Sequence, residues 1–235
     1  MLFLLLNTPT SIAKQLVVTE ILPPYQFYQE NNVLSGFSLE VMEEVFKITD
    51  DDIDLQVLPW ARAYRTVLNK PNTLIFSLSR SLLREKLFIW GGKLTTDFDY
   101  AWGLKENFQT PITQLEQLRK YKIALTNLTS TDQYFKQKKY PDVYEVVSQD
   151  HGLKMLILNR VDVIIGMKNP LKARAKILNL DFDKLKSIIP ITPVDLYFAF
   201  SLNTDKKIVN KYREAYKEIV KNGTLTKLKI KWDVQ

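Results

Sequence analysis

Residues 76–90 read FSLSRSLLREKLFIW, and the interpretation of the whole chain starts from this stretch. It opens as a buried strand and closes on an apolar run. Between them, hydroxyls occupy every second position, at Ser77, Ser79 and Ser81, and a guanidinium follows at Arg84. An arginine fork pairs with a carboxylate through two hydrogen bonds, and hydroxyl and free N–H groups at a turn complete the anion's shell. The stretch therefore predicts a turn that holds a small anion; the alternative for the arginine is a surface ion pair.

Strand and helix patterns alternate on the N-terminal side of this stretch. Residues 15–22, 53–58 and 73–79 carry apolar runs typical of strands, and apolar residues at helical spacing lie between them, at 36–47 and 61–69. The order is therefore βαβαβ with short loops. Units of this kind build mostly parallel, right-handed layers, in which ligands bind at the carboxyl ends of the strands.

A second α/β set follows on the C-terminal side. Strand patterns at residues 122–127, 144–149 and 162–167 are separated by helical patterns. Residues 188–202 then return as extended chain, and residues 204–223 form an amphipathic helix that ends on a glycine. Two similar α/β units joined by two extended connections predict an α/β protein with two lobes and a double hinge.

Composition excludes several classes of protein. With 46% apolar and 11% aromatic residues, the 235-residue chain can bury a substantial core, and no apolar run approaches the length of a membrane span. The chain has no cysteine and one histidine, which excludes disulfides, thiolate chemistry and multi-histidine metal sites, so we expect neither a metal nor a cofactor. The net charge of +7 comes from dispersed residues, which favours a solvated basic face over a nucleic-acid interface.

Residues 1–13, MLFLLLNTPTSIA, resemble the back half of a secretory signal peptide. A short apolar run is followed by small residues in an A-x-A-like pattern, although the basic front part is missing. We expect a truncated signal peptide here, with a buried N-terminal strand as the alternative. A signal would place the protein in the periplasm.

Seven motifs in order carry a resemblance to a known family. The order is similar to that of the type 2 periplasmic solute-binding proteins, in particular the amino-acid-binding group called bacterial solute-binding protein family 3. The motifs are PPYQFYQENNVLSGFSLEVMEEV, LPWARA, SLSRSLLRE, ALTNLTSTDQYF, VDVIIGM, VDLYFAFS and NGTLTKLKIKW. The resemblance implies a two-lobed type 2 periplasmic-binding-protein fold, in which each lobe is a mixed sheet flanked by helices and a double-stranded hinge joins the lobes. Lobe 1 would comprise residues 14–98 and 192–235, and lobe 2 residues 99–191.

The resemblance also implies a function and partners. A monomer would capture a small carboxylate, an amino acid or a related compound, between its lobes and deliver it to the permease of an ABC transporter. The alternatives are a sensory module of a membrane receptor and a dehydratase-like enzyme on the same fold. An enzyme needs a general acid or base in the cleft, and the sequence analysis places no Asp, Glu or His there.

The resemblance assigns ligand-binding roles within both lobes. In lobe 1 the carboxylate would bind at Ser77, Ser79, Ser81 and Arg84, the anion turn described above. In lobe 2 the family has a glycine followed by two hydroxyl residues, and here the hydroxyls are Thr129 and Ser130, with Leu128 in place of the glycine.

Three further positions follow from the same resemblance. Tyr25 and Trp60 would stack on the ligand at the cleft edge, with core or hinge packing as the alternative for each. Family members place an aspartate for the ligand's ammonium at the position of Met167. Without a carboxylate there, a free α-amino group lacks its partner, so the ligand could be another carboxylate.

Overall fold

The computed structural model describes residues 14–234 and shows two lobes joined by two long strands. Lobe 1 contains a small hairpin, three further strands and four helices, which are β2 (Phe27–Tyr28), β3 (Leu34–Ser35), β1 (Gln15–Thr19), β4 (Ile53–Val57), β5 (Thr73–Ser79), α1 (Phe37–Thr49), α2 (Trp60–Asn69), α6 (Lys206–Lys221) and α7 (Thr224–Trp232). Lobe 2 contains β7 (Ile123–Thr126), β8 (Val143–Val146), β9 (Val163–Met167), α3 (Ser130–Gln137), α4 (Gln149–Ile157) and α5 (Lys168–Ile177). Short 3-10 turns lie at Lys105–Asn107, Leu115–Lys120 and Phe182–Lys184.

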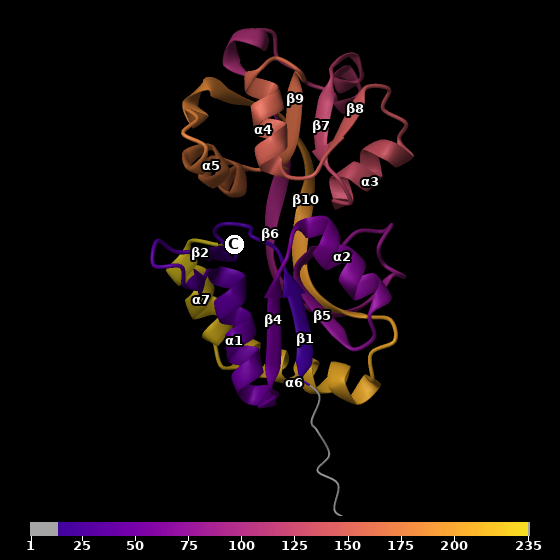
Figure 1. Ribbon diagram of the computed structural model, residues 1–235, viewed down its shortest axis with the longest axis vertical. Coiled ribbons are helices and arrows are strands. Elements are labelled where there is room, and N and C mark those ends of the chain that lie inside the picture. Colours follow the sequence, from indigo (N-terminus) through magenta and orange to yellow (C-terminus); the bar gives the residue numbers. More distant parts are fainter. Residues whose placement is uncertain (1–13, 235) are drawn as a thin grey trace, which may run out of the picture.

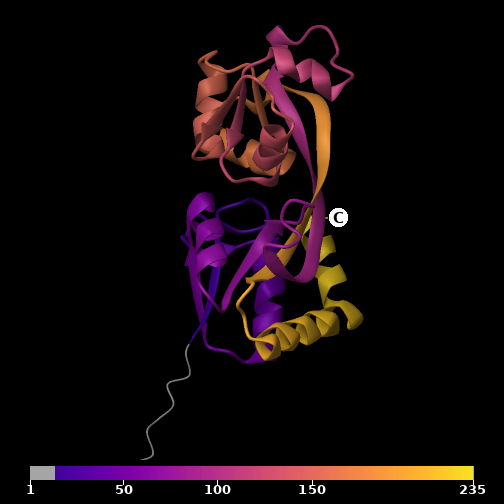
Figure 2. The same cartoon turned by 90° about the vertical axis from the view of Figure 1, so that its right-hand side faces the viewer.

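The two joining strands are β6 (Phe88–Leu104) and β10 (Leu185–Ser201). They pair antiparallel along their length and run from one lobe into the other along one side of the molecule (Figure 2). Their hydrogen bonds merge the strands of both lobes into one eight-stranded sheet in the order β4-β1-β5-β10-β6-β9-β7-β8. The mixed sheet flanked by helices that was expected in each lobe is confirmed. The sheets of the two lobes are continuous because each connection is one unbroken strand of 17 residues.

Parallel strand pairs build the outer part of each lobe. In lobe 1, β1 pairs parallel with β4 and β5; in lobe 2, β7 pairs parallel with β8 and β9. Parallel pairing aligns the carboxyl ends of neighbouring strands, and in both lobes these ends face the other lobe (Figure 1). The expected βαβαβ order in lobe 1 is thus confirmed. The lobe boundaries at residues 98/99 and 191/192 stay a prediction.

Gly36 shows how the chain turns into its first helix. It precedes α1 with a φ of 131°, and a Cβ there would lie 2.5 Å from the backbone oxygen of Tyr25. Both the positive φ and the close approach require glycine. The turn brings the segment of the proline pair against the start of α1, where the backbone N–H of Ser38 donates to the Tyr25 oxygen.

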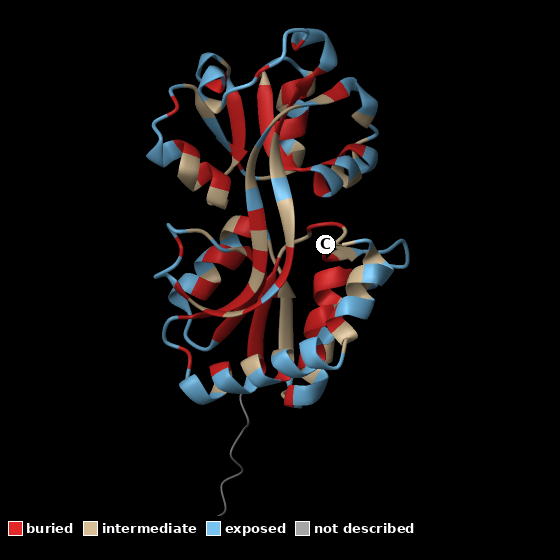
Figure 3. Cartoon of the chain, turned by 180° about the vertical axis from the view of Figure 1, so that it is seen from behind, coloured by how far each residue is buried: buried red, intermediate tan, exposed pale blue. Residues whose placement is uncertain are grey.

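Each lobe buries apolar side chains on both faces of the sheet. Within β1, Val17 packs with α1, α6 and α7, whereas its neighbour Val18 packs with α2 on the opposite face. Ala124 and Leu125 of β7 divide in the same way between two clusters in lobe 2. Figure 3 shows buried residues along the strands and the inner faces of the helices. This two-sided burial explains why these strands read as continuous apolar runs.

No helix within residues 14–234 combines the length and apolarity needed to cross a bilayer. The signal peptide expected at residues 1–13 lies outside the described residues.

Candidate functional site

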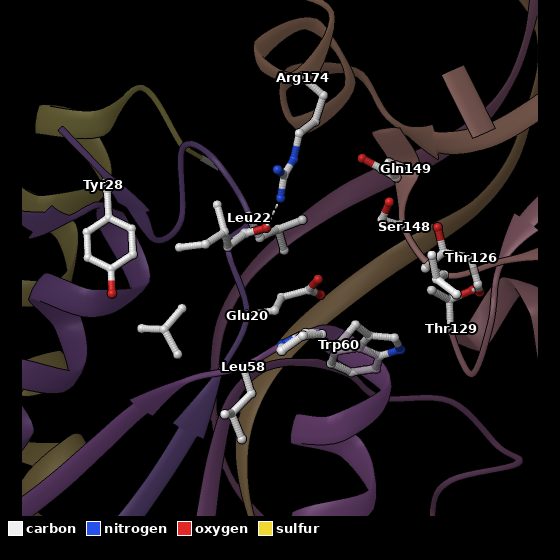
Figure 4. A pocket seen from close by; sticks show the side chains of 14 residues that line it. Glu20, Leu22, Tyr28, Leu58, Trp60, Thr126, Thr129, Ser148, Gln149 and Arg174 are labelled. Carbon is white, nitrogen blue, oxygen red and sulfur yellow. Dashed lines mark hydrogen bonds between the residues drawn. The ribbon is translucent and has the colours of Figure 1, made fainter. Parts of the chain in front are cut away.

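Two neighbouring cavities lie between the lobes and share part of their lining. The outer cavity has a volume of about 380 Å³ and the inner cavity, next to the hinge strands, about 70 Å³. Six residues line both: Glu20, Leu22, Trp60, Thr126, Thr129 and Gln149. In Figure 4, Glu20 and Trp60 of lobe 1 face Thr126, Thr129, Gln149 and Arg174 of lobe 2 across the same space. The cavities therefore expose polar groups of both lobes to a common ligand volume.

The positions of these residues follow from the sheet. Glu20 follows β1, Thr126 and Met167 end β7 and β9, and Ser79 ends β5. All four lie at the carboxyl ends of strands that pair in parallel. The backbone N–H and C=O groups at such ends, and the side chains that follow them, point into the space between the lobes.

Arg84 is fully buried at the contact between the lobes. Its Nη1 donates to the carbonyl and hydroxyl oxygens of Ser79, at 3.0 and 2.7 Å, within lobe 1. Its Nη2 donates to the Leu128 carbonyl at 2.7 Å, and its Nε to Gln133 Oε1 at 3.0 Å, both in lobe 2. The guanidinium lies 4.9 Å from the ring centre of Tyr64.

Burial lowers the pKa of Arg84 to about 10, so the side chain still carries its charge at neutral pH. It lines neither of the two cavities, although its hydrogen-bond partner Ser79 lines the inner one. Its role in holding a ligand carboxylate therefore stays a prediction, and direct contact would require Arg84 to exchange one of its present partners.

The serines of the anion turn separate into two groups. Ser77 and Ser79 line the inner cavity, where the Ser77 hydroxyl also donates to Gln26 Oε1 at 2.7 Å. Ser81 lines neither of these two cavities but a third one between the lobes, which it shares with Ser79, Ser130 and Thr131. Its buried hydroxyl has no hydrogen-bond partner among residues 14–234. A ligand contact from Ser81 stays a prediction.

The hydroxyl pair of lobe 2 lies at the start of α3. Thr129 and Ser130 both line the inner cavity. The Thr129 hydroxyl caps the helix by accepting from the backbone N–H of Asp132 at 3.1 Å. Leu128, which stands where the family has glycine, adopts a φ of 62°. The left-handed backbone is thus kept by a leucine, and it turns the Leu128 carbonyl toward Arg84.

The remaining three predicted residues lie in different surroundings. Trp60 lines both cavities, and its buried indole N–H has no partner among the described residues. Met167 lines the inner cavity and packs with the core of lobe 1. Tyr25 lines neither cavity; its hydroxyl donates to Asp97 in the hinge, and burial together with that carboxylate raises the pKa of Tyr25. The tyrosine is held by the hinge in this arrangement, and a ligand contact stays a prediction.

Two acids in the cavities correct the sequence analysis, which placed none there. Glu20 lines both cavities, and no hydrogen-bond or ion-pair partner of its carboxylate occurs within residues 14–234. Burial raises the pKa of Glu20 to about 7, against the opposing fields of Arg174 and Arg84. Asp99 of β6 lines the inner cavity and accepts a hydrogen bond from the Thr131 hydroxyl. Burial raises the pKa of Asp99 to about 6.

Sequence reasoning also missed Arg174 of α5, which lines the outer cavity. Its Nη2 donates to the Ile21 carbonyl of lobe 1 at 2.7 Å, and its Nη1 lies 3.5 Å from Asp150 within lobe 2. The contact with Ile21 runs from lobe 2 to lobe 1, whereas the bond from Arg84 to the Leu128 carbonyl runs from lobe 1 to lobe 2. The structure is therefore a closed arrangement, in which each lobe donates an arginine hydrogen bond to a backbone carbonyl of the other.

Comparison with known proteins gives one family and many similar folds. The family described as bacterial extracellular solute-binding proteins, family 3, matches residues 15–235. A comparison with curated proteins finds no match.

Among solved structures, a histidine kinase sensor domain with similarity to periplasmic binding proteins superimposes with a TM-score of 0.82 at 17% identity, covering 94% of this chain and 96% of the other. An ancestral arginine-binding protein bound to arginine superimposes with a TM-score of 0.79 at 18% identity, covering 93% of this chain and 97% of the other. The arginine-, lysine-, histidine-binding protein ArtJ from Geobacillus stearothermophilus superimposes with a TM-score of 0.77 at 18% identity, covering 94% of this chain and 95% of the other. At these identities the likeness shows the fold, which confirms the expected periplasmic-binding-protein architecture.

Proposed function

The chain belongs to the bacterial extracellular solute-binding proteins of family 3, and on that premise we propose that it is a non-enzymatic periplasmic binding protein for a small carboxylate-bearing ligand. The ligand is an amino acid or a related compound, which the monomer encloses between its lobes and presents to an ABC transporter. One observation carries the proposal: an interlobe volume of about 380 Å³ lined by charged and polar side chains of both lobes. Ligand pockets have volumes of roughly this size or larger, and contacts to both lobes favour the closed form.

The carboxylate of the ligand fits the inner cavity on the side of α3. The first N–H groups of an α-helix have no partner within the helix, and they attract anions. Thr129 and Ser130 stand at this helix start and line the inner cavity together with Ser79 of lobe 1, whose hydroxyl accepts a hydrogen bond from Arg84. We assign the carboxylate to this place, with Ser77 as a further hydroxyl.

Arg84 then supports the carboxylate through its charge and through Ser79, or directly after releasing the Leu128 carbonyl. A charge-assisted hydrogen bond contributes about 1.5 to 3 kcal/mol, whereas micromolar binding needs about 8 kcal/mol. Other contacts must supply the difference. Trp60 and Glu20 line both cavities, and neither the indole N–H nor the carboxylate has a hydrogen-bond partner within residues 14–234, so both groups are available for such contacts.

A sensory role is the second candidate, because a histidine kinase sensor domain superimposes along 94% of the chain. Both roles need the same ligand-bound closed form and differ only in the membrane partner that reads it. Co-purification of the chain with a permease or with a receptor kinase from its own host membranes would separate them.

A thermal-shift screen of the full chain tests the proposal. The compounds are the twenty proteinogenic amino acids together with small mono- and dicarboxylates at millimolar concentration. A ligand that binds only the folded form raises the free energy of unfolding and therefore the melting temperature. At a ligand concentration of one hundred times the dissociation constant, the gain in the free energy of unfolding is about 2.7 kcal/mol. At least one carboxylate compound should shift the transition; a flat response across the panel would contradict the proposed function.

A further inference from the structure

The third cavity between the lobes has no part in the proposed function. Its volume is about 530 Å³, within the roughly 300 to 1,000 Å³ of small-molecule pockets. Its wall is built from the end of β5 with the segment that follows, from α3 and from the hinge strand β10. We call it the hinge-side cavity, and its lining comprises residues 79–83 and 191–194 together with Ser130, Thr131, Tyr134, Gln137 and Lys138.

The described lining of the hinge-side cavity carries positive charge and no negative charge. It includes Arg80 and Lys138 but no Asp or Glu. The charge of Arg80 is compensated by an ion pair with Glu85. Lys138 has no acidic partner within residues 14–234, and its Nζ lies 5.9 Å from the centre of the Tyr134 ring. Lys138 is therefore the cation that is available to a negatively charged guest.

The Ser81 hydroxyl is an unused hydrogen-bond donor in the same wall. It is buried without a partner among residues 14–234, and a buried hydroxyl that lacks a hydrogen bond costs free energy. Because no bond holds it, the hydroxyl is free to rotate toward a guest in the cavity. The Thr131 hydroxyl, by contrast, already donates to Asp99. An anionic oxygen in the cavity would satisfy the donor that the protein leaves open at Ser81.

Apolar side chains form the rest of the wall. Leu82 is 95% exposed and Leu83 is 42% exposed, and both line the hinge-side cavity. Ile191, Pro193 and Val194 of the hinge strand add further apolar surface. An apolar chain placed on these side chains would remove their surface from water, which is favourable. The cavity thus combines a cation and a free hydroxyl with a surface suited to hydrocarbon.

We propose that the hinge-side cavity is a second binding site, for an amphipathic anion with a negatively charged head group on an apolar chain. The head group pairs with Lys138 and accepts a hydrogen bond from the Ser81 hydroxyl, and the chain covers Leu82 and Leu83. Carboxylate, sulfonate and phosphate head groups all satisfy this chemistry. The inference goes beyond the proposed function, whose ligand lies in the other two cavities.

Calorimetric titration of the full chain with octane-1-sulfonate tests the site. Octan-1-ol and octylammonium carry the same chain with a neutral and a positive head group. The sulfonate should bind at millimolar concentration or below, and at least ten times more tightly than either comparison compound. That ratio corresponds to about 1.4 kcal/mol. Absence of sulfonate binding, or octan-1-ol that binds as tightly as the sulfonate, would overturn the proposal.

Substitutions with matched controls locate the binding. Lys138→Glu should weaken octane-1-sulfonate at least tenfold, whereas Lys139→Glu, the same charge reversal at a neighbour outside the lining, should leave the affinity unchanged within threefold. Leu82→Ser should weaken the sulfonate at least threefold, while Leu158→Ser, at an exposed leucine of lobe 2 outside the cavity, should have no effect. Equal losses from the two charge reversals would indicate attraction to the basic surface as a whole and would overturn the site.

Competition separates this site from that of the proposed function. Octane-1-sulfonate should not displace the best carboxylate of the thermal-shift screen, because neither Lys138 nor Leu82 lines the other two cavities. Mutual displacement would place both compounds in one cavity and overturn the second site, with the proposed function intact. A screen without any binding carboxylate would contradict the proposed function, and the Lys138 variants would still decide on the hinge-side cavity.

Amphipathic anions have two sources, free acids in solution and anionic lipids of a bilayer. Sedimentation with phosphatidylglycerol vesicles distinguishes them. Native protein that pellets with the vesicles, together with a Lys138→Glu protein that does not, assigns the ligand to the bilayer. Native protein that stays in solution while it binds octane-1-sulfonate assigns the ligand to the free acids.

Discussion

Glu20→Gln tests the charge placed in the cavity by measuring stability in the absence of ligand. The carboxylate of Glu20 is half-buried between the lobes without a hydrogen-bond partner among residues 14–234, and desolvation raises its pKa from 4.5 to about 7. The folded protein therefore holds the proton more tightly than the unfolded chain does. For an acid with a raised pKa, stability is fully present below about pH 4.5 and is lost as the pH rises to about 7.

The magnitude follows from the same two values. A difference of about 2.5 in pKa corresponds to about 3 kcal/mol at 1.36 kcal/mol for each tenfold step in proton affinity. Because the side chain borders a cavity that water can fill, we expect about 2 kcal/mol in practice. Glutamine keeps the size and removes the charge, so the variant should be about 2 kcal/mol more stable than the native protein at pH 8 and equally stable at pH 4.5.

The assay is ligand-free thermal or urea unfolding of both proteins at pH 4.5, 6 and 8. A gain of 2 kcal/mol corresponds to a rise of about 4 to 8 °C in melting temperature for a chain of this size. Asp99, with a pKa of about 6, adds its own pH dependence to the stability of both proteins. This contribution cancels when the two stabilities are subtracted. The reasoning fails if the difference between the two proteins is the same at pH 4.5 and pH 8, or if the native protein is the more stable at pH 8.

Three further predictions concern the lobe contact, the closed arrangement and the core. Arg84→Lys keeps the charge but loses the guanidinium that bonds both Ser79 and Leu128. The affinity for the best ligand, measured by calorimetry, should fall at least tenfold. Unchanged affinity would count against an anion site at this turn. Arg174→Ala removes the bond to the Ile21 carbonyl and should increase the ligand-free radius of gyration in X-ray scattering, whereas Ala at the exposed Lys172 of the same helix should not. Gly91→Ala puts a Cβ 2.1 Å from the Phe198 ring and should lower the free energy of unfolding by about 1 to 3 kcal/mol in urea. Gly152→Ala, whose Cβ has no atom nearer than 3.6 Å, should leave the free energy of unfolding unchanged or raise it. Equal effects of the two substitutions would contradict the packing.

The elements of the fold were predictable because their signals are local. The strand at β1 reads as an apolar run since Val17 and Val18 are buried on opposite faces. The extended chain of β10 was expected from its sequence as well. The continuity of the sheet through both lobes was not, because it depends on pairing between β6 and β10, which are about a hundred residues apart.

The candidate site was predictable in part. Ser77 and Ser79 were found because they end a strand with an unusual hydroxyl pattern, and both line the inner cavity. Glu20 carries a similar signal, since it follows the strand Gln15–Thr19, but a single acid after a strand is common on surfaces. Asp99 could not be assigned from sequence, because only the pairing of β6 with strands far away in the chain brings this residue to the inner cavity.

Two reciprocal bonds, from Arg84 to Leu128 and from Arg174 to Ile21, join the lobes through protein atoms alone. They lower the free energy of the closed form by themselves, so a solute has to supply less of the free energy that closure needs. A solute that contacts both lobes would extend the lifetime of the closed form beyond what these two bonds give.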